Sequence, residues 1–221
     1  MNFIHFPQEL VVNWHITEAC NYKCSYCFAK WQEKDQKELL HSKESMIQLM
    51  TEIEKLPTIL NQESKLFFQK IRLNLVGGET FLYKPQLLNI VTEAKKRGFQ
   101  LSAITNGSRL DDELIEVIAK NFDCLGISID SLNDESKFHN FLARHQDFIH
   151  IISSENNDEM IHSYLMIDPL GRFFQNSNTS LKPYHYSRKI IDYGIAQALN
   201  EIDFNINKFF HRYKLINTLS I

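Results

Sequence analysis

No apolar run in the sequence approaches the roughly 18 residues that a membrane-spanning helix requires. The first ten residues also lack the basic stretch and the apolar stretch that together mark a secretory signal. We therefore expect a soluble protein of the cytoplasm with no membrane partner.

An excess of positive charge is missing too, because 24 Lys and Arg residues stand against 27 Asp and Glu residues, for a formal net charge of −3. Proteins that hold DNA or RNA by broad electrostatic attraction depend on such an excess. The composition therefore argues against a nucleic-acid polymer as the partner.

Repeats, low-complexity segments and a clear linker are also missing, so we expect one sizeable core. We also expect the protein to be a monomer.

Cysteine is scarce, with four residues among 221, and its spacing is uneven. Cys124 stands alone, whereas Cys20, Cys24 and Cys27 fall within eight residues. In a reducing compartment such a small set rarely builds a disulfide framework. Thiols clustered on one short segment instead indicate a metal centre.

Short β-prone runs alternate with amphipathic helical patterns as far as Asp130. The predicted strands are Leu10–Ile16, Ile71–Val76, Gln100–Thr105 and Cys124–Ile129. The predicted helices are Ser45–Leu56, with Ser45 as its N-cap and Pro57 as its stop, a helix that starts near Pro85 and ends before Gly98, and Asp111–Asn121. This order is typical of an α/β protein with a parallel sheet.

Polar segments follow each predicted strand, namely Thr17–Cys27, Gly77–Glu79, Thr105–Ser108 and Ser128–Asp130. The carboxyl ends of parallel strands share one edge of the sheet, and ligands of α/β proteins bind there. We therefore expect these four segments to form a single site.

The alternation stops after Asp130. A short helical stretch is predicted at Phe138–His145, and Ser163–Asp168 with Arg172–Asn176 predicts a β-hairpin. Helices are predicted over Ser187–Glu201 and Asn205–Ile216.

The three clustered cysteines form the pattern C-x3-C-x2-C. Three thiolates on a four-iron cluster leave one iron open to another ligand, as a cluster that binds substrate requires. A structural zinc ion would instead need a fourth protein ligand, which His15 or His41 could provide. The pattern alone leaves both kinds of centre open.

C-x3-C-x2-C with Tyr26 before the last cysteine resembles the signature of the radical S-adenosylmethionine (SAM) enzymes. The resemblance implies a partial (β/α)6 barrel, a [4Fe-4S] cluster on Cys20, Cys24 and Cys27, and SAM as the cofactor. It implies that Glu79 holds the amino group of SAM. The full set of implied SAM-binding residues is Gly77, Gly78, Glu79, Thr105, Asn106, Ser108, Ser128 and Asp130.

A closer resemblance is to the viperin family, in particular its prokaryotic members. It is carried by segments over most of the chain: Val12–His15, Glu18–Cys24, Gly77–Leu82, Ile129–Ser131, Ser163–Asp168 and Arg172-Phe173. It implies an enzyme that dehydrates a nucleoside triphosphate (CTP, GTP or UTP) to its 3′-deoxy-3′,4′-didehydro form, an antiviral chain terminator. A flavodoxin or ferredoxin would supply the electron.

The same resemblance implies roles for four further residues. Asn13, His15 and Arg172 are expected to bind the nucleotide, and Tyr164 is expected near the ribose as a hydrogen donor.

The sequence departs from this family at two places. Thr80 stands where the family has Pro, a change that should leave the Gly77-Gly78-Glu79 turn intact. Between Asp134 and Phe138 the chain lacks about two βα units, which in the family carry basic residues that grip the triphosphate. Either the gene product is shortened here or the sequence is incomplete.

We expect a radical-SAM core over residues 1–134 and an extension over 135–221 packed on the same core. If the shortening belongs to the protein, the alternative function is a catalytically silent scaffold that binds a metal or a partner.

Overall fold

The computed structural model describes residues 8–24, 27, 37–63, 67–128, 149–152, 165–175, 185–202 and 204. They form an eight-stranded sheet in the order β5-β4-β3-β2-β1-β6-β7-β8. Its strands are β1 (Gln8–His15), β2 (Phe68–Val76), β3 (Gln100–Thr105), β4 (Cys124–Ser128), β5 (Ile149–Ile152), β6 (Leu165–Ile167), β7 (Arg172–Gln175) and β8 (His185–Lys189). Neighbours from β5 to β6 are parallel, whereas β7 pairs antiparallel with β6 and with β8.

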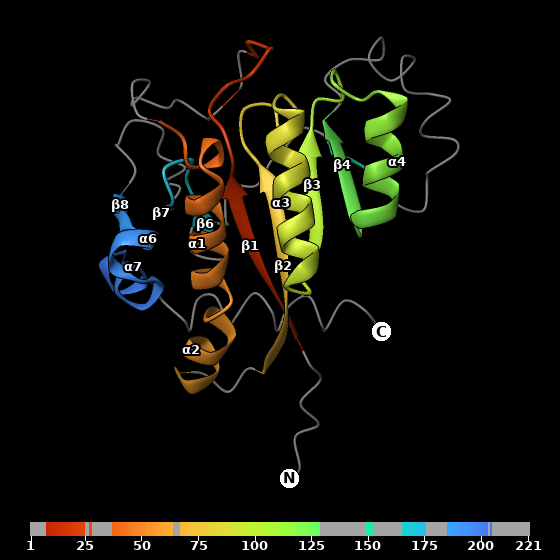
Figure 1. Cartoon of the computed structure of the whole chain (residues 1–221). Coiled ribbons are helices and arrows are strands. Elements are labelled where there is room, and N and C mark those ends of the chain that lie inside the picture. Colours follow the sequence, from red (N-terminus) through yellow and green to blue (C-terminus); the bar gives the residue numbers. More distant parts are fainter. Residues whose placement is uncertain are drawn as a thin grey trace.

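Helices α1, α3 and α4 line one face of the sheet (Figure 1). The helices are the 3-10 turn η1 (Leu39–His41), α1 (Lys43–Ile53), α2 (Leu56–Glu63), α3 (Lys84–Lys96), α4 (Asp112–Asn121), α6 (Ile190–Tyr193) and α7 (Ile195–Glu201). In β2 the side chains of Leu73 and Leu75 are fully buried, whereas Arg72 and Asn74, on the opposite face, stay partly exposed. This alternation packs the apolar face against helices and leaves polar groups for the other face.

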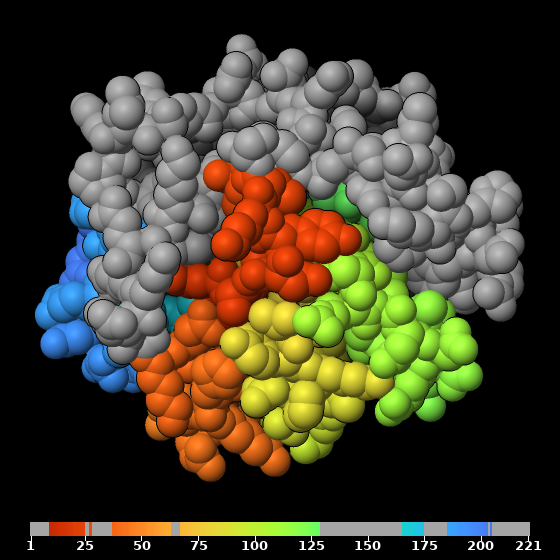
Figure 2. Space-filling model, turned by 90° about the horizontal axis from the view of Figure 1, so that it is seen from above, coloured from red at the N-terminus to blue at the C-terminus, as the bar shows by residue number. Residues whose placement is uncertain are grey.

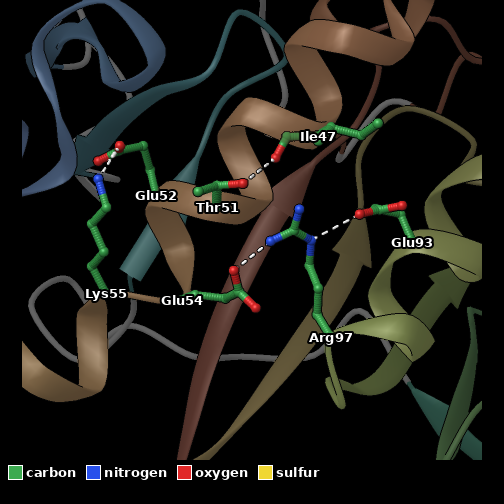
Figure 3. Close-up of polar contacts among 7 residues, drawn as sticks. All are labelled: Ile47, Thr51, Glu52, Glu54, Lys55, Glu93 and Arg97. Carbon is green, nitrogen blue, oxygen red and sulfur yellow. Dashed lines mark hydrogen bonds and ion pairs between the residues drawn. The ribbon is translucent and has the colours of Figure 1, made fainter.

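Arg97, which follows α3, joins the helix layer together (Figure 3). Its guanidinium pairs with Glu54 at the end of α1, and its Nε donates to Glu93 of α3 (3.0 Å). The pairing ties the two helices at the end of the layer away from the carboxyl ends of the strands.

The predicted α/β architecture with a parallel sheet is confirmed. Strands occur at all four predicted places, and two of the predicted helices are present as α3 and α4. The side chain of Asp111 caps α4 by accepting from the Leu114 N–H (2.7 Å). The predicted hairpin is present as β6 and β7.

Two predicted helix boundaries are wrong. Ser42, not Ser45, caps α1, because the Ser42 hydroxyl accepts from the backbone N–H of Ser45 (3.2 Å). Pro57 does not end the helical region, because it lies in the first turn of α2. Backbone N–H groups in the first turn have no acceptor within the helix, so proline is tolerated there.

The predicted helix Ser187–Glu201 is wrong over its first part. Its first residues continue β8 as far as Lys189, and Gly194, at φ 85°, separates α6 from α7. The predicted helices Phe138–His145 and Asn205–Ile216 lie outside the described residues.

The sheet also contains a strand that the sequence did not predict, β5, which pairs with β4. Strands from both predicted units share this sheet, since β5 lies beside β4 and β6 beside β1. The boundary at residue 134 lies outside the described residues, so the division into units stays a prediction. Within the described part of the chain, no helix has the length and apolarity to cross a membrane.

Candidate active site

The segment after β1 runs alongside the turn after β2, at the carboxyl edge of the sheet. Ile16 N–H donates to the Val76 carbonyl, Gly78 N–H to that of Thr17 and Glu79 N–H to that of Ala19, each at 2.8 Å. The parallel pairing of β1 and β2 therefore continues beyond the strands. Figure 2 looks down on this edge, where the N-terminal segment (red) lies between the orange, yellow and green parts of the chain.

This close approach explains the two glycines. A Cβ on Gly78 would lie 2.2 Å from the Ala19 carbonyl oxygen, and one on Gly77 would lie 2.6 Å from that of Thr17. Both distances are far inside van der Waals contact, so any larger residue would push the cysteine segment away. The backbone of the cysteine segment thus requires glycine at both positions.

Glu79 is fully buried and joins the turn after β2 to the end of β3. Its carboxylate accepts from the Thr105 hydroxyl (2.5 Å) and from the backbone N–H groups of Asn106 (2.9 Å) and Phe81 (3.1 Å). Burial raises the pKa of Glu79 above its ordinary value, against the opposing effect of these hydrogen bonds. A carboxylate held this way stays in place for a cationic group that approaches it.

The loop after β3 is hydrogen-bonded to the cysteine segment. The Asn106 amide donates to Asn21 Oδ1 (3.1 Å) and makes a long contact with Cys20 Sγ (3.9 Å). Asn21 donates to the Ser108 hydroxyl (2.8 Å), and that hydroxyl donates to Asn106 Oδ1 (2.5 Å). The structure therefore brings together the first three of the predicted strand-end segments.

The three clustered cysteines are accessible. Cys20 and Cys27 are exposed, Cys24 is half-buried, and the Cys27 N–H donates to the Cys24 carbonyl (3.2 Å). Partial burial raises the pKa of the Cys20 thiol above its ordinary value, with smaller contributions from the charges of Glu79, Cys24 and Cys27. Among the described residues, no three His, Cys, Asp or Glu side chains converge as a preformed metal site.

Asn13 and His15 lie on β1, on the face opposite the helices. Asn13 is one member of a row across three strands: Ser102 donates to Asn74 Oδ1 (2.8 Å), and Asn74 donates to Asn13 Oδ1 (2.6 Å). His15 is buried and packs edge-on against Phe174 (5.3 Å between ring centroids). Burial lowers the pKa of His15 to about 3, so its imidazole is neutral at neutral pH.

Arg172 is engaged within the hairpin. Its guanidinium pairs with the buried carboxylate of Asp168 (2.7 Å) and lies 4.2 Å from the ring centroid of Tyr186. These contacts give Arg172 a structural role, and its predicted contact with the nucleotide stays a prediction.

Ser128 ends β4 and is half-buried. Tyr164 and Asp130 lie outside the described residues.

The structure adds residues that the sequence analysis did not select. Asn74 and Ser102 flank Asn13 in the row, and polar residues on otherwise apolar strands are the signal that would have found them. Glu38 contacts Thr17 and Glu18 beside the cysteines, and no local pattern marks it because it lies 20 residues along the chain from Glu18.

Comparison with known proteins shows which family the chain resembles. The profile of the Radical SAM superfamily matches residues 14–155. A protein of Psychrobacter lutiphocae, named S-adenosylmethionine-dependent nucleotide dehydratase, is 41% identical over 94% of this chain and 95% of its own length. A protein of the same name from Pseudoalteromonas ulvae is 28% identical, over 95% of this chain and 94% of its own.

A solved structure of anSMEcpe with bound AdoMet and the Kp18Cys peptide has a similar fold, with a TM-score of 0.56 and 13% identity. The similarity covers 91% of this chain and 83% of that one.

The Psychrobacter alignment spans 286 positions, more than the 221 residues of the whole chain, so that relative has residues that this chain lacks.

Proposed function

Because the chain belongs to the radical SAM superfamily and, within it, to the viperin-like S-adenosylmethionine-dependent nucleotide dehydratases, we propose that it dehydrates the ribose of a nucleoside triphosphate. The substrate is CTP, GTP or UTP, and the product is the 3′-deoxy-3′,4′-didehydro nucleotide, a chain terminator in antiviral defence. Enzymes of this superfamily use a [4Fe-4S] cluster and SAM. A flavodoxin or ferredoxin donates the electron.

The residues present fit these two groups. Cys20, Cys24 and Cys27 supply three thiols from one accessible segment, which suits a cluster that keeps one iron for SAM. The glycine turn beside them brings backbone within hydrogen-bond distance of the cysteine segment, with no side chain in the way. Glu79, fixed by Thr105 and Asn106, is the carboxylate that would receive the amino group of SAM.

The observation that carries the proposal is the hydrogen-bonded joint between the cysteine segment, the Gly77-Gly78-Glu79 turn and the loop after β3. Cys20 and its neighbours Ala19 and Asn21 therefore lie beside Glu79 and Asn106, which supports a cluster and SAM bound next to each other. When held by Cys20, Cys24, Cys27 and Glu79, the cluster and SAM would supply a 5′-deoxyadenosyl radical, which is able to take a hydrogen atom from C4′ of the ribose. Loss of the 3′ hydroxyl as water then requires one further electron and one proton, which Tyr164 would deliver as the hydrogen donor and the electron donor would restore. The chain's own contribution is to position these groups and to exclude water.

The row of Asn13, Asn74 and Ser102, on the face of the sheet opposite the helices, supports a nucleotide site next to this edge. Asn13 offers a side-chain amide whose oxygen accepts from Asn74, so its N–H groups are the part of the amide that would meet an acceptor such as a ribose oxygen. His15 is neutral and buried, so it suits a hydrogen bond to sugar or base rather than a charge pair with phosphate.

A second candidate function is a catalytically silent scaffold. The observation that favours it is the length of the Psychrobacter alignment, which shows that residues of the relative have no counterpart here. Loss of basic residues that hold the triphosphate would leave metal binding intact and remove the nucleotide reaction.

Anaerobic reconstitution with iron and sulfide, followed by addition of SAM, a reductant and each of CTP, GTP and UTP, separates the two candidates. The dehydratase releases 5′-deoxyadenosine and a nucleotide that is lighter by one water, both measured by mass spectrometry. A chain that binds one zinc ion and leaves SAM intact contradicts the proposal.

Cysteine variants supply the matched control. Cys24→Ala should lose the brown absorbance of the cluster and the release of 5′-deoxyadenosine. Cys124→Ala should keep both, because Cys124 is half-buried on β4 and lies outside the clustered motif. Tyr164→Phe should keep the absorbance and lose only product, as expected of a hydrogen donor.

A further inference from the structure

Glu38 holds the start of the cysteine segment. One oxygen of its carboxylate accepts from the Thr17 hydroxyl (2.7 Å), and the other accepts from the backbone N–H of Glu18 (2.6 Å). The Thr17 hydroxyl oxygen in turn accepts from the Ala19 N–H (3.0 Å). Both carboxylate oxygens are therefore used on the residues immediately before Cys20.

The same residues are held from their other side by the glycine turn. The carbonyls of Thr17 and Ala19 accept from Gly78 and Glu79, as described above. Thr17 is fully buried, and the Glu38 side chain is only 15% exposed. Charge-assisted hydrogen bonds in such a partly desolvated place are stronger than those at an open surface.

Glu38 is itself anchored by the C-terminal hairpin. The backbone N–H of Leu39 donates to the Pro169 carbonyl (2.8 Å) in the turn between β6 and β7. A Cβ on Gly171 would lie 2.6 Å from the Leu39 side chain, so this turn packs closely on the residue after Glu38. The position of Glu38 is thus set by a part of the chain far from the cysteines in sequence.

We propose that Glu38 is a positioning residue that fixes the cysteine segment against the Gly77-Gly78 turn and thereby sets the spacing between the cluster and bound SAM. The proposal deepens the proposed function and rests on it for the cluster and for the place of SAM. Glu38 acts through Thr17 and Glu18, the two residues of the cysteine segment that it contacts.

Glu38→Gln is the test variant, because glutamine keeps the size of the side chain but replaces one accepting oxygen with a donor. Glu54→Gln is the matched control, because Glu54 pairs with Arg97 at the far end of α1 (Figure 3). The first measurement is hydrogen exchange of the Glu18 amide in the metal-free chain. Exchange should become about tenfold faster in Glu38→Gln and stay unchanged in Glu54→Gln.

The second measurement uses the reconstituted protein. Iron content and the melting temperature should stay close to those of the wild type in Glu38→Gln, since all three thiols remain. The dissociation constant for SAM should rise about tenfold, and the change that SAM induces in the electron paramagnetic resonance spectrum of the reduced cluster should shrink. Glu54→Gln should match the wild type in each respect.

Wild-type exchange at Glu18 in Glu38→Gln, or unaltered SAM affinity, overturns the proposal. A fall in iron, melting temperature and SAM affinity together also overturns it, because that pattern indicates a merely structural role. None of these measurements uses a nucleotide, so a chain that forms no didehydro product still tests Glu38. If the wild type binds no cluster, the part about SAM fails with the proposed function, and exchange at Glu18 still decides whether Glu38 holds the segment.

Discussion

Asn74 donates its side-chain amide to the side-chain oxygen of Asn13 (2.6 Å), directly across the parallel pair β1 and β2. Ser102 of β3 extends the row by donating to Asn74 (2.8 Å). Asn13 and Ser102 are buried, so each amide or hydroxyl in the row depends on its neighbour for a partner. The row fixes which atoms of the Asn13 amide remain available to a ligand.

Asn74→Ala should remove the partner of Asn13 and destabilise the chain by about 1–3 kcal/mol, the usual consequence of leaving a buried polar group unsatisfied. It should raise KM for the nucleotide while SAM cleavage without nucleotide is preserved. Urea unfolding and steady-state kinetics measure the two effects. Ser102→Ala, one step farther from Asn13, should have the smaller effect on KM, and an equal or larger effect would contradict an orienting role for the row.

Gly78→Ala should separate the cysteine segment from the turn after β2. The new Cβ would lie 2.2 Å from the Ala19 carbonyl oxygen, and backbone on both sides must move to relieve that overlap. We expect a loss of stability above about 3 kcal/mol and a loss of SAM binding, measured by thermal unfolding and by titration with SAM.

Gly98→Ala is the control for this variant. Gly98 ends the α3 region at φ +71° and has open space around it, so alanine there should cost only about 1 kcal/mol, from the left-handed backbone alone. SAM binding should be unchanged. If Gly78→Ala behaved like Gly98→Ala, the close approach of the two segments would not matter for the site.

Local sequence patterns predicted the parallel strands and the segments after them. Each of these strands is a run of apolar, β-prone residues, and each following turn is marked by polar or glycine residues. The structure adds β8, whose sequence HYSRK is too polar to suggest a strand. It pairs antiparallel with β7, with a register shift between Arg172 and Phe174. Tertiary pairing, not local propensity, determines that strand. Pro57 has a different, local reason: proline is equally compatible with the residue after one helix and with the first turn of the next, and in the fold it lies in the first turn of α2.

Some residues of the candidate site could likewise be selected from the sequence, and others could not. Gly77, Gly78, Glu79 and Asn106 could be selected because their types and places after strands are distinctive. Glu38 could not, because its function depends on a segment that returns to the cysteines from elsewhere in the chain. The ion pair between Arg172 and Asp168 could not be predicted either, although the two residues lie only four apart, because the sequence does not show which groups are buried.

Arg172→Gln should destabilise the chain by about 3 kcal/mol, because it leaves the carboxylate of Asp168 buried without its cation. Burial already raises the pKa of Asp168, and Arg172 is the charge that opposes this rise. Thermal and urea unfolding measure the loss, and Arg188→Gln, which breaks an exposed pair with Glu201, should cost less than about 1 kcal/mol. A raised KM for nucleotide with full stability would instead assign Arg172 to the substrate.

His15 should make the stability of the chain depend on pH. Its pKa is about 3 in the folded state, against an ordinary value of 6.5, because burial disfavours the imidazolium. Below pH 6.5 the unfolded chain binds a proton at this position that the folded chain refuses, so the stability from His15 is complete above that pH and is lost as the pH falls toward 3. Between pH 7 and pH 5 the loss should be about 2 kcal/mol.

His15→Gln should remove this dependence, since glutamine does not titrate. The measurement is the free energy of unfolding in urea at pH 7 and pH 5, and the difference between wild type and variant isolates His15 from the carboxyl groups that titrate in both. His185→Gln is the control, because His185 is exposed at the start of β8 and its replacement should leave the wild-type dependence in place. Equal pH dependence in the wild type and His15→Gln would mean that the imidazole is not buried in solution, and the assignment of His15 as a neutral hydrogen-bonding group for the nucleotide would fail with it.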